Sequence, residues 1–269
     1  MAAPSSAHAA KARHSATTST SGDILRQILV IIATLSVIAS NLLADIIPIN
    51  NLTTAEISDR FNVYFVPAGY VFSIWGLIYV ALAGYTVYQA LPSQRTVSIQ
   101  RRIAYPYIFS SLFNVIWIVL WHYELFTWTL LVMLGLLASL IIVYMRLNEG
   151  RKPASRREFW LLYAPFSLYL GWITVATIAN ATTLLNSVGW SGGGISPELW
   201  AVIMLAVATI AGVFFGWMRH DVVYAGVLVW SFAGIAYKHW ATPLVAYTAV
   251  AAVVIVAGAG LLGAKRDDS

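Results

Sequence analysis

The amino-acid sequence predicts an all-α, polytopic helical membrane protein, and two observations lead to this prediction. Hydrophobic residues make up 59% of the 269 residues and charged residues only 10%, whereas soluble domains carry about 25% charged residues. Long apolar segments also recur along the chain, each close to the length of about 20 residues that a membrane-spanning helix needs. The chain contains no cysteine, which excludes disulfides and thiolate metal sites.

The first segment, residues 1–24, is predicted to be a disordered N-terminal tail. It is rich in Ala, Ser and Thr, and its basic residues are Lys11 and Arg13. It lacks the apolar run of a cleavable signal peptide. A transit peptide is a second interpretation, because no acidic residue precedes Asp23.

Eight candidate membrane spans follow the tail. They cover residues 25–48, 65–89, 104–121, 126–145, 159–184, 199–218, 222–237 and 241–263. The seventh is short for a bilayer, but charged residues bound it on both sides.

The basic residues predict how these spans are oriented. With the N-terminus inside, only Arg60 and Lys238 of the 16 Lys and Arg residues fall outside. The positive-inside rule then places both chain termini in the cytoplasm. We therefore expect a multi-pass protein of the plasma (inner) membrane, with the lipid bilayer and not nucleic acid as its partner.

An aromatic stripe marks the second span, Phe65–Gln89. Phe72, Trp75 and Tyr79 are spaced i, i+3 and i+7, so they lie on one helix face. Such a stripe favours a ligand or partner surface, and ordinary packing is the alternative. Pro67 is expected in the first turn of this helix.

Two amides lie inside later spans. Asn114 has Trp117 one turn further on, and Asn180 follows Ala176 by four residues and Trp172 by eight. A buried amide needs a hydrogen-bond partner, which either a neighbouring helix or a ligand can provide.

Ionisable groups are absent from the middle of every predicted span. This argues against an ion-driven pump and leaves no nucleophile and base for a hydrolase. Near the outer surface, His122 precedes Glu124 by two residues. This histidine could ligate a metal or haem iron, or it could simply cap a short turn in water.

Three motifs, taken together, resemble the TspO/MBR family, the tryptophan-rich sensory proteins related to the mitochondrial translocator protein. The resemblance covers residues 25–185. The motifs are Pro67-Ala68-Gly69-Tyr70 with Trp75 and Tyr79, then Asn114 with Trp117, and finally Trp172, Ala176, Thr177 and Asn180. Departures from the family pattern occur at Ala68, Tyr70 and Leu168.

The resemblance implies a five-helix bundle around a cavity for a porphyrin, haem or a sterol-like apolar ligand, with no required cofactor. It also implies a homodimer, and it makes the long first outer loop a lid over the cavity. The resemblance implies that the cavity is lined by Trp75, Tyr79, Asn114, Trp117, Trp172 and Ala176. To these candidate ligand-binding residues we add Phe72 of the aromatic stripe and the amide Asn180.

The rest of the chain lies outside the resemblance. We expect an outer loop at 186–198, three additional spans at 199–263 and a cytoplasmic tail at 264–269. The predicted function is a binding or sensory membrane protein for a tetrapyrrole or another flat apolar ligand. The alternatives are a transporter of such a ligand and a non-catalytic assembly or docking protein. Porphyrin breakdown, suggested for relatives, ranks below all of these.

Overall fold

The structure is a computed structural model, and it describes residues 20–47, 49–61, 63–149, 153–190 and 192–267. Every regular element in these ranges is helical, which confirms the predicted all-α fold. The long helices are α1 (Ser21–Ile46), α3 (Ile74–Ala90), α4 (Ser98–His122), α5 (Phe126–Asn148), α7 (Ala164–Ser187), α8 (Pro197–Val213), α9 (Val222–Lys238) and α10 (Pro243–Asp267).

Shorter elements join or extend these helices. The short α-helices are α2 (Thr54–Asp59) and α6 (Arg156–Glu158). The 3-10 turns are Ile49–Asn51, Gly69–Ser73, Pro92–Gln94 and Gly192–Gly194, and two π-helical turns, Phe159–Tyr163 and Phe214–Met218, adjoin α7 and α8.

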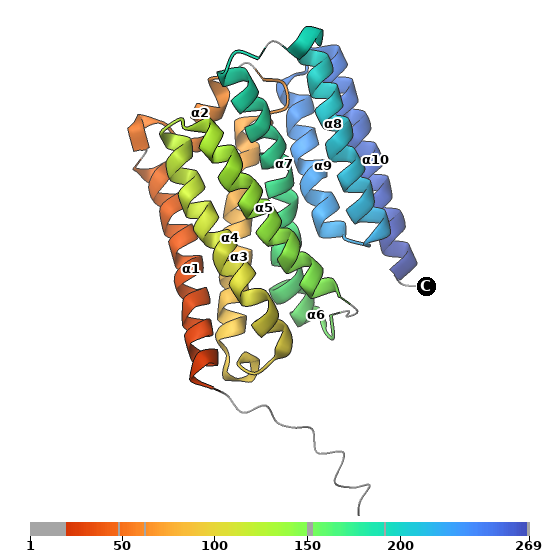
Figure 1. The fold of residues 1–269 in the computed structure, drawn as a ribbon. Coiled ribbons are helices and arrows are strands. Elements are labelled where there is room, and N and C mark those ends of the chain that lie inside the picture. The colour runs from red at the N-terminus through yellow and green to blue at the C-terminus, as the bar shows by residue number, and fades with distance from the viewer. Residues whose placement is uncertain (1–19, 48, 62, 150–152, 191, 268–269) are drawn as a thin grey trace, which may run out of the picture.

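The long helices stand side by side in two groups (Figure 1). In the first group α4 packs on α1 and α5, α5 packs on α7, and α3 contacts α1 and α7. In the second group α8, α9 and α10 pack on one another, and α9 contacts α7. Helix α7 is therefore the shared wall. It belongs to the continuous helical span Arg156–Ser187, in which 72% of an apolar 18-residue stretch is buried.

Seven helices in the described ranges are long and apolar enough to cross a membrane. Helix α9, with 17 residues, is only about 25 Å long at 1.5 Å per residue. Figure 1 places the start of α1 and the end of α10 at the same end of the bundle. The predicted count of eight crossings therefore depends on whether α9 spans the bilayer.

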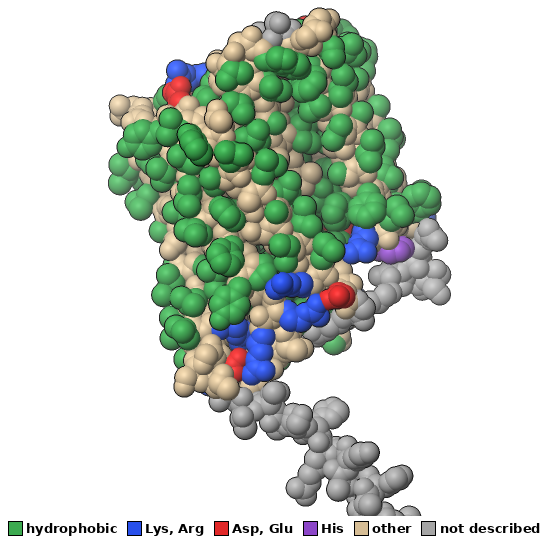
Figure 2. All heavy atoms as spheres, viewed as in Figure 1, with side chains coloured by type: hydrophobic (Ala, Val, Ile, Leu, Met, Phe, Trp, Pro, Cys, Tyr) green, Lys and Arg blue, Asp and Glu red, His purple; other side chains and the backbone are tan. Residues whose placement is uncertain are grey.

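Hydrophobic side chains cover most of the height of the molecule (Figure 2). Most Lys and Arg side chains visible on this face gather at the end where α6 lies. An apolar belt of this kind suits contact with lipid tails. The arrangement fits the integral membrane class, and the orientation of the termini stays a prediction.

Close helix contacts join the second group to α7 and hold it together. A Cβ atom on Gly171 of α7 would lie 3.0 Å from the Cβ of Val227 in α9. Asp221 caps α9 by accepting the backbone N–H of Tyr224 at 2.9 Å, and it accepts the hydroxyl of Ser167 in α7 at 2.6 Å. Small residues and polar contacts of this kind are how helices associate within a membrane.

The expected helix start at Pro67 is wrong. Residues 66–68 have no regular structure, a 3-10 turn covers Gly69–Ser73, and α3 begins only at Ile74. The physical reason is a tertiary bond, because the Ala68 N–H donates to the carbonyl of Gly234 in α9 at 3.2 Å. Residues 66–68 are therefore held by α9 and are not part of a helix.

Other boundaries differ by a few residues from the predicted spans. Helix α1 begins at Ser21, because Thr20 and Asp23 form a capping box before it. Helix α4 begins at Ser98 and includes Pro106. The predicted disordered tail lies, up to residue 19, outside the described residues.

Candidate ligand-binding site

Six of the eight predicted site residues line one small cavity between α2, α3, α4 and α7, called here the inner cavity. They are Phe72, Trp75, Trp117, Trp172, Ala176 and Asn180. The remaining described lining residues are Thr54, Ser58, Val66, Pro67, Trp121, Val175 and Ala179. The volume is about 40 Å³, enough for no more than about three water molecules.

Five of the thirteen described lining residues have aromatic rings. The Phe72 and Trp75 rings lie edge to face against Trp172, with centroids 5.7 and 6.1 Å apart. On the facing helix Trp117 and Trp121 stack on each other at 5.3 Å. Flat aromatic faces of this kind favour a flat apolar ligand.

Tyr79 does not line the inner cavity. It lies one helical turn beyond Trp75, and the two rings stack with centroids 5.7 Å apart. The predicted pairing along one helix face is therefore present. In this structure Tyr79 supports the Trp75 ring and has no cavity surface of its own.

Asn114 joins three helices and does not face the cavity either. Its carbonyl oxygen accepts the amide of Asn41 in α1 at 2.7 Å, and its own amide donates to the Tyr169 hydroxyl in α7 at 2.9 Å. The side chain is fully buried. A buried amide was expected to bond either to a neighbouring helix or to a ligand, and Asn114 bonds to neighbouring helices.

Asn180 lines the cavity, but both ends of its amide are bonded to protein. Its oxygen accepts the Trp117 indole N–H at 3.1 Å, and its nitrogen donates to the Thr129 hydroxyl of α5 at 3.0 Å. Asn180 therefore fixes the orientation of the Trp117 ring.

Trp172 carries an unpaired donor beside the cavity. Its indole nitrogen is buried and has no hydrogen-bond acceptor among the described residues, and the side chain is 3% exposed. A buried N–H without an acceptor is destabilising by roughly 1–3 kcal/mol. A ligand with an oxygen acceptor would remove that penalty.

Helix α2, within the predicted first outer loop, borders the cavity through Thr54 and Ser58, and we call it the lid helix. Thr53 caps the helix in a capping box with Glu56, and the Thr53 backbone N–H bond lowers the pKa of that carboxyl. The carbonyl of Thr54 accepts the Trp121 indole N–H at 3.2 Å. Ile57, on the same helix, is fully buried.

An open cavity of about 300 Å³ lies on the other side of the lid. It is lined by Asp45, Thr53, Thr54, Ala55, Phe72, Ser73 and Trp75. Three of these residues, Thr54, Phe72 and Trp75, also line the inner cavity. They form the partition between the two spaces, and their movement would join them.

Helix α9 holds the segment that carries Phe72. The Trp230 indole N–H donates to the Val71 carbonyl at 3.2 Å, next to the bond between Ala68 and Gly234. Lys238 at the end of α9 also forms an ion pair with Asp59 of the lid helix. The second helix group therefore fixes one wall of the site.

His122 bonds to its own helix through one ring nitrogen, and the other, Nε2, is buried without a partner among the described residues. Its Nδ1 lies 2.8 Å from the carbonyl of Ile118 on the same helix, and the side chain is buried. Across the described ranges, no three residues of the types His, Cys, Asp and Glu lie close enough to hold a metal ion.

A family model described as TSPO-like protein matches residues 27–262, which is most of the chain. The chain belongs to the TSPO-like family. No curated protein and no solved structure is detectably similar to it. As a member of this family, the chain is an integral membrane protein of a binding or sensory class.

The TSPO-like match extends further than the sequence analysis expected. The recognised motifs end at Asn180, whereas the family match continues through α8, α9 and α10. The contacts of α9 with the cavity wall give this extent a physical basis, because α9 hydrogen-bonds the segment that carries Phe72.

Several residues that shape the site escaped sequence reasoning. Asn41, Thr129 and Tyr169 complete the hydrogen bonds of the two predicted amides. Each of the three is a polar residue within a predicted apolar span, and this was the available signal. Trp230 carried no such signal, because its partner, the carbonyl of Val71, lies 159 residues away in the chain.

Proposed function

We propose that this chain binds a flat apolar ligand carrying a hydrogen-bond acceptor in the inner cavity, with a tetrapyrrole such as protoporphyrin or haem as the leading candidate. The observation that carries the proposal is the buried, unpaired N–H of Trp172 within an aromatic wall. Stacking would supply affinity, and this donor would set the ligand's orientation.

The ligand must open the site in order to bind. Ligand pockets usually measure about 300–1,000 Å³, whereas the inner cavity has about 40 Å³. The open cavity beyond Phe72 and Trp75 adds about 300 Å³. We therefore place the route of binding beneath α2, through rotation of these two rings. Closure of the lid would then be the signal in a sensory protein.

The chemistry of the wall supports binding over catalysis. Among the thirteen described lining residues of the inner cavity, none has an ionisable side chain. General acid–base chemistry needs such a group within hydrogen-bonding reach of the reacting atoms. The proposal therefore contains no porphyrin-degrading step.

The test is a titration of the purified protein with protoporphyrin and with haem, followed by tryptophan quenching. Trp172→Phe keeps an aromatic ring and removes the N–H, so affinity should fall about threefold to tenfold, the worth of one hydrogen bond. Ala176→Phe should abolish binding by filling the cavity. Trp160→Phe is the matched control, because Trp160 is 62% exposed and lies away from the cavity lining.

Unchanged affinity in both cavity variants would refute the inner cavity as the binding site. Saturable binding that Ala176→Phe removes leaves sensing and transport to be separated by ligand flux into sealed vesicles.

A further inference from the structure

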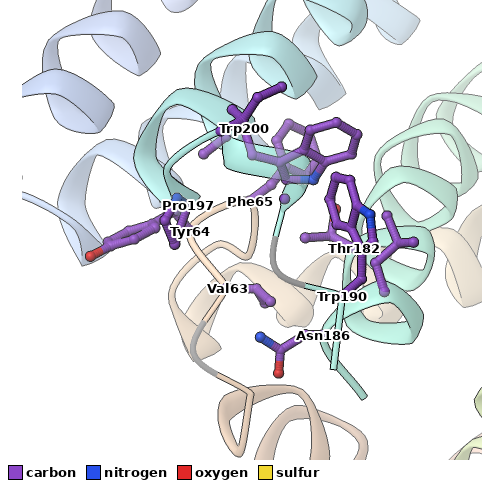
Figure 3. A pocket seen from close by; sticks show the side chains of 12 residues that line it. Val63, Tyr64, Phe65, Thr182, Asn186, Trp190, Pro197 and Trp200 are labelled. Carbon is purple, nitrogen blue, oxygen red and sulfur yellow. The ribbon is translucent and has the colours of Figure 1, made fainter. Parts of the chain in front are cut away.

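A further pocket, open on one side, lies where α7, α8 and residues 63–65 meet (Figure 3). We call it the interhelical cavity. Its volume is about 310 Å³, within the range of small-molecule sites. It shares no described lining residue with the inner cavity. It also includes residues from both helix groups, so the second group is required to form it.

The walls of the interhelical cavity are mainly aromatic and apolar, and Thr182 and Asn186 add polar side chains. The Trp190 and Trp200 rings meet edge to face with centroids 4.8 Å apart, and Figure 3 shows both indoles beside Phe65 and Thr182. None of the twelve described lining residues carries a charge. A phosphate or carboxylate group would therefore find no ion partner in this space.

One donor in this wall has no oxygen or nitrogen acceptor. The indole nitrogen of Trp200 is buried and unpaired among the described residues. The Trp190 ring is packed against it, but a ring face is a weaker acceptor than an oxygen. Trp200 also lies in the first turn of a membrane-length helix. This is the depth at which tryptophans meet the headgroup boundary.

We propose that the interhelical cavity binds a bilayer glycerolipid, with an acyl chain against the aromatic walls and an ester carbonyl accepting the N–H of Trp200. The apolar lining fits the chain, and the unpaired donor fits the ester. The absence of a lining cation leaves the lipid phosphate outside the cavity. The proposal does not depend on the inner cavity having a ligand.

Segment 63–67 links the proposed lipid site to the inner cavity. Its first three residues line the interhelical cavity, and its next two, Val66 and Pro67, line the inner cavity. On α7, Thr182 faces the first space and Asn180 the second. Segment 63–67 and α7 therefore separate the two cavities. A lipid in the interhelical cavity would contact this wall on one face, and a ligand in the inner cavity would contact it on the other.

The test is native mass spectrometry of the purified full chain with equal amounts of two phosphatidylcholines of the same chain length. One has ester-linked chains, and the other has ether-linked chains without carbonyl groups. The wild-type protein should bind the ester lipid about threefold to tenfold more tightly, the worth of one hydrogen bond. In Trp200→Phe this preference should fall to about one.

Trp128→Phe is the matched control, because Trp128 is 60% exposed near the start of α5 and lies outside the cavity. It should keep the ester preference. Equal binding of the two lipids by the wild-type protein would overturn the proposal without any variant. A preference that survives in Trp200→Phe, or that disappears equally in Trp128→Phe, would overturn it too.

Discussion

The contact between α9 and the wall of the inner cavity can be tested at Gly234. A Cβ atom at this position would lie 2.2 Å from Cγ2 of Val71 and 3.2 Å from Cβ of Pro67. Val71 is fully buried and β-branched, so its side chain has little freedom to rotate away. Gly234→Ala must therefore push the segment that carries Phe72 away from α9.

The expected loss follows from two contributions. Overpacking a close contact is destabilising by about 1–3 kcal/mol, and weakening the bond from Ala68 to Gly234 adds about 1 kcal/mol. The alanine also gains helix propensity, so the right comparison is Gly226→Ala on the same helix, where a Cβ meets nothing within 4 Å. We expect Gly234→Ala to be about 2–4 kcal/mol less stable than Gly226→Ala.

The assay is unfolding of the purified protein in mixed micelles with increasing dodecyl sulfate, followed by circular dichroism. Val71→Ala removes the clashing methyl group, so the double variant should recover about 1–3 kcal/mol relative to the sum of the single changes. Equal stability of Gly234→Ala and Gly226→Ala would refute the close contact. Strict additivity in the double variant would refute Val71 as its partner.

Three further predictions follow from other parts of the chain. Asn114→Ala should lower stability by about 1–3 kcal/mol, because it removes the partner of buried polar groups, and ligand titration should show unchanged affinity. Burial raises the pKa of Asp221, so the folded state keeps this proton to higher pH than the unfolded state does. Stability should therefore fall as pH rises from about 3.9 to the raised pKa, and equilibrium unfolding of Asp221→Asn should show no such fall. Because the chain has no cysteine, Arg219→Cys and Trp240→Cys can test α9: an impermeant maleimide should label only the latter from outside intact cells, and equal labelling would mean that α9 does not cross.

Sequence reasoning was most successful where the signal is local. Apolar length located the helices, and the Asn and Trp residues of the third and fifth predicted spans identified two of the cavity walls. Asn114 and Asn180 looked equivalent in sequence, since each has a tryptophan on the same helix face. Only the rotation of each helix decides that Asn180 lines the cavity and Asn114 joins helices.

The extended start of the second predicted span could not be predicted, because the contact that decides it is not local. Its local pattern, a proline before an apolar run, is a good helix signal. The competing bond joins Ala68 to Gly234 across more than 160 residues of chain, and no local pattern reports such a pair. The missing acceptor of Trp172 is likewise a property of packing, invisible in the residue types.

The contacts of α9 with the first helix group bear on the predicted boundary at residue 185, where the resemblance to the family was expected to end. The motifs of the family end before it, so the last three helices look like an addition to a complete bundle. Yet Trp230 and Gly234 form hydrogen bonds with the backbone of the segment that precedes Phe72. Lys238 also forms an ion pair with the lid helix. A cavity whose partition and lid are both attached to α9 can open only if α9 permits it. In the opening that we propose, the second helix group is therefore placed to set the threshold.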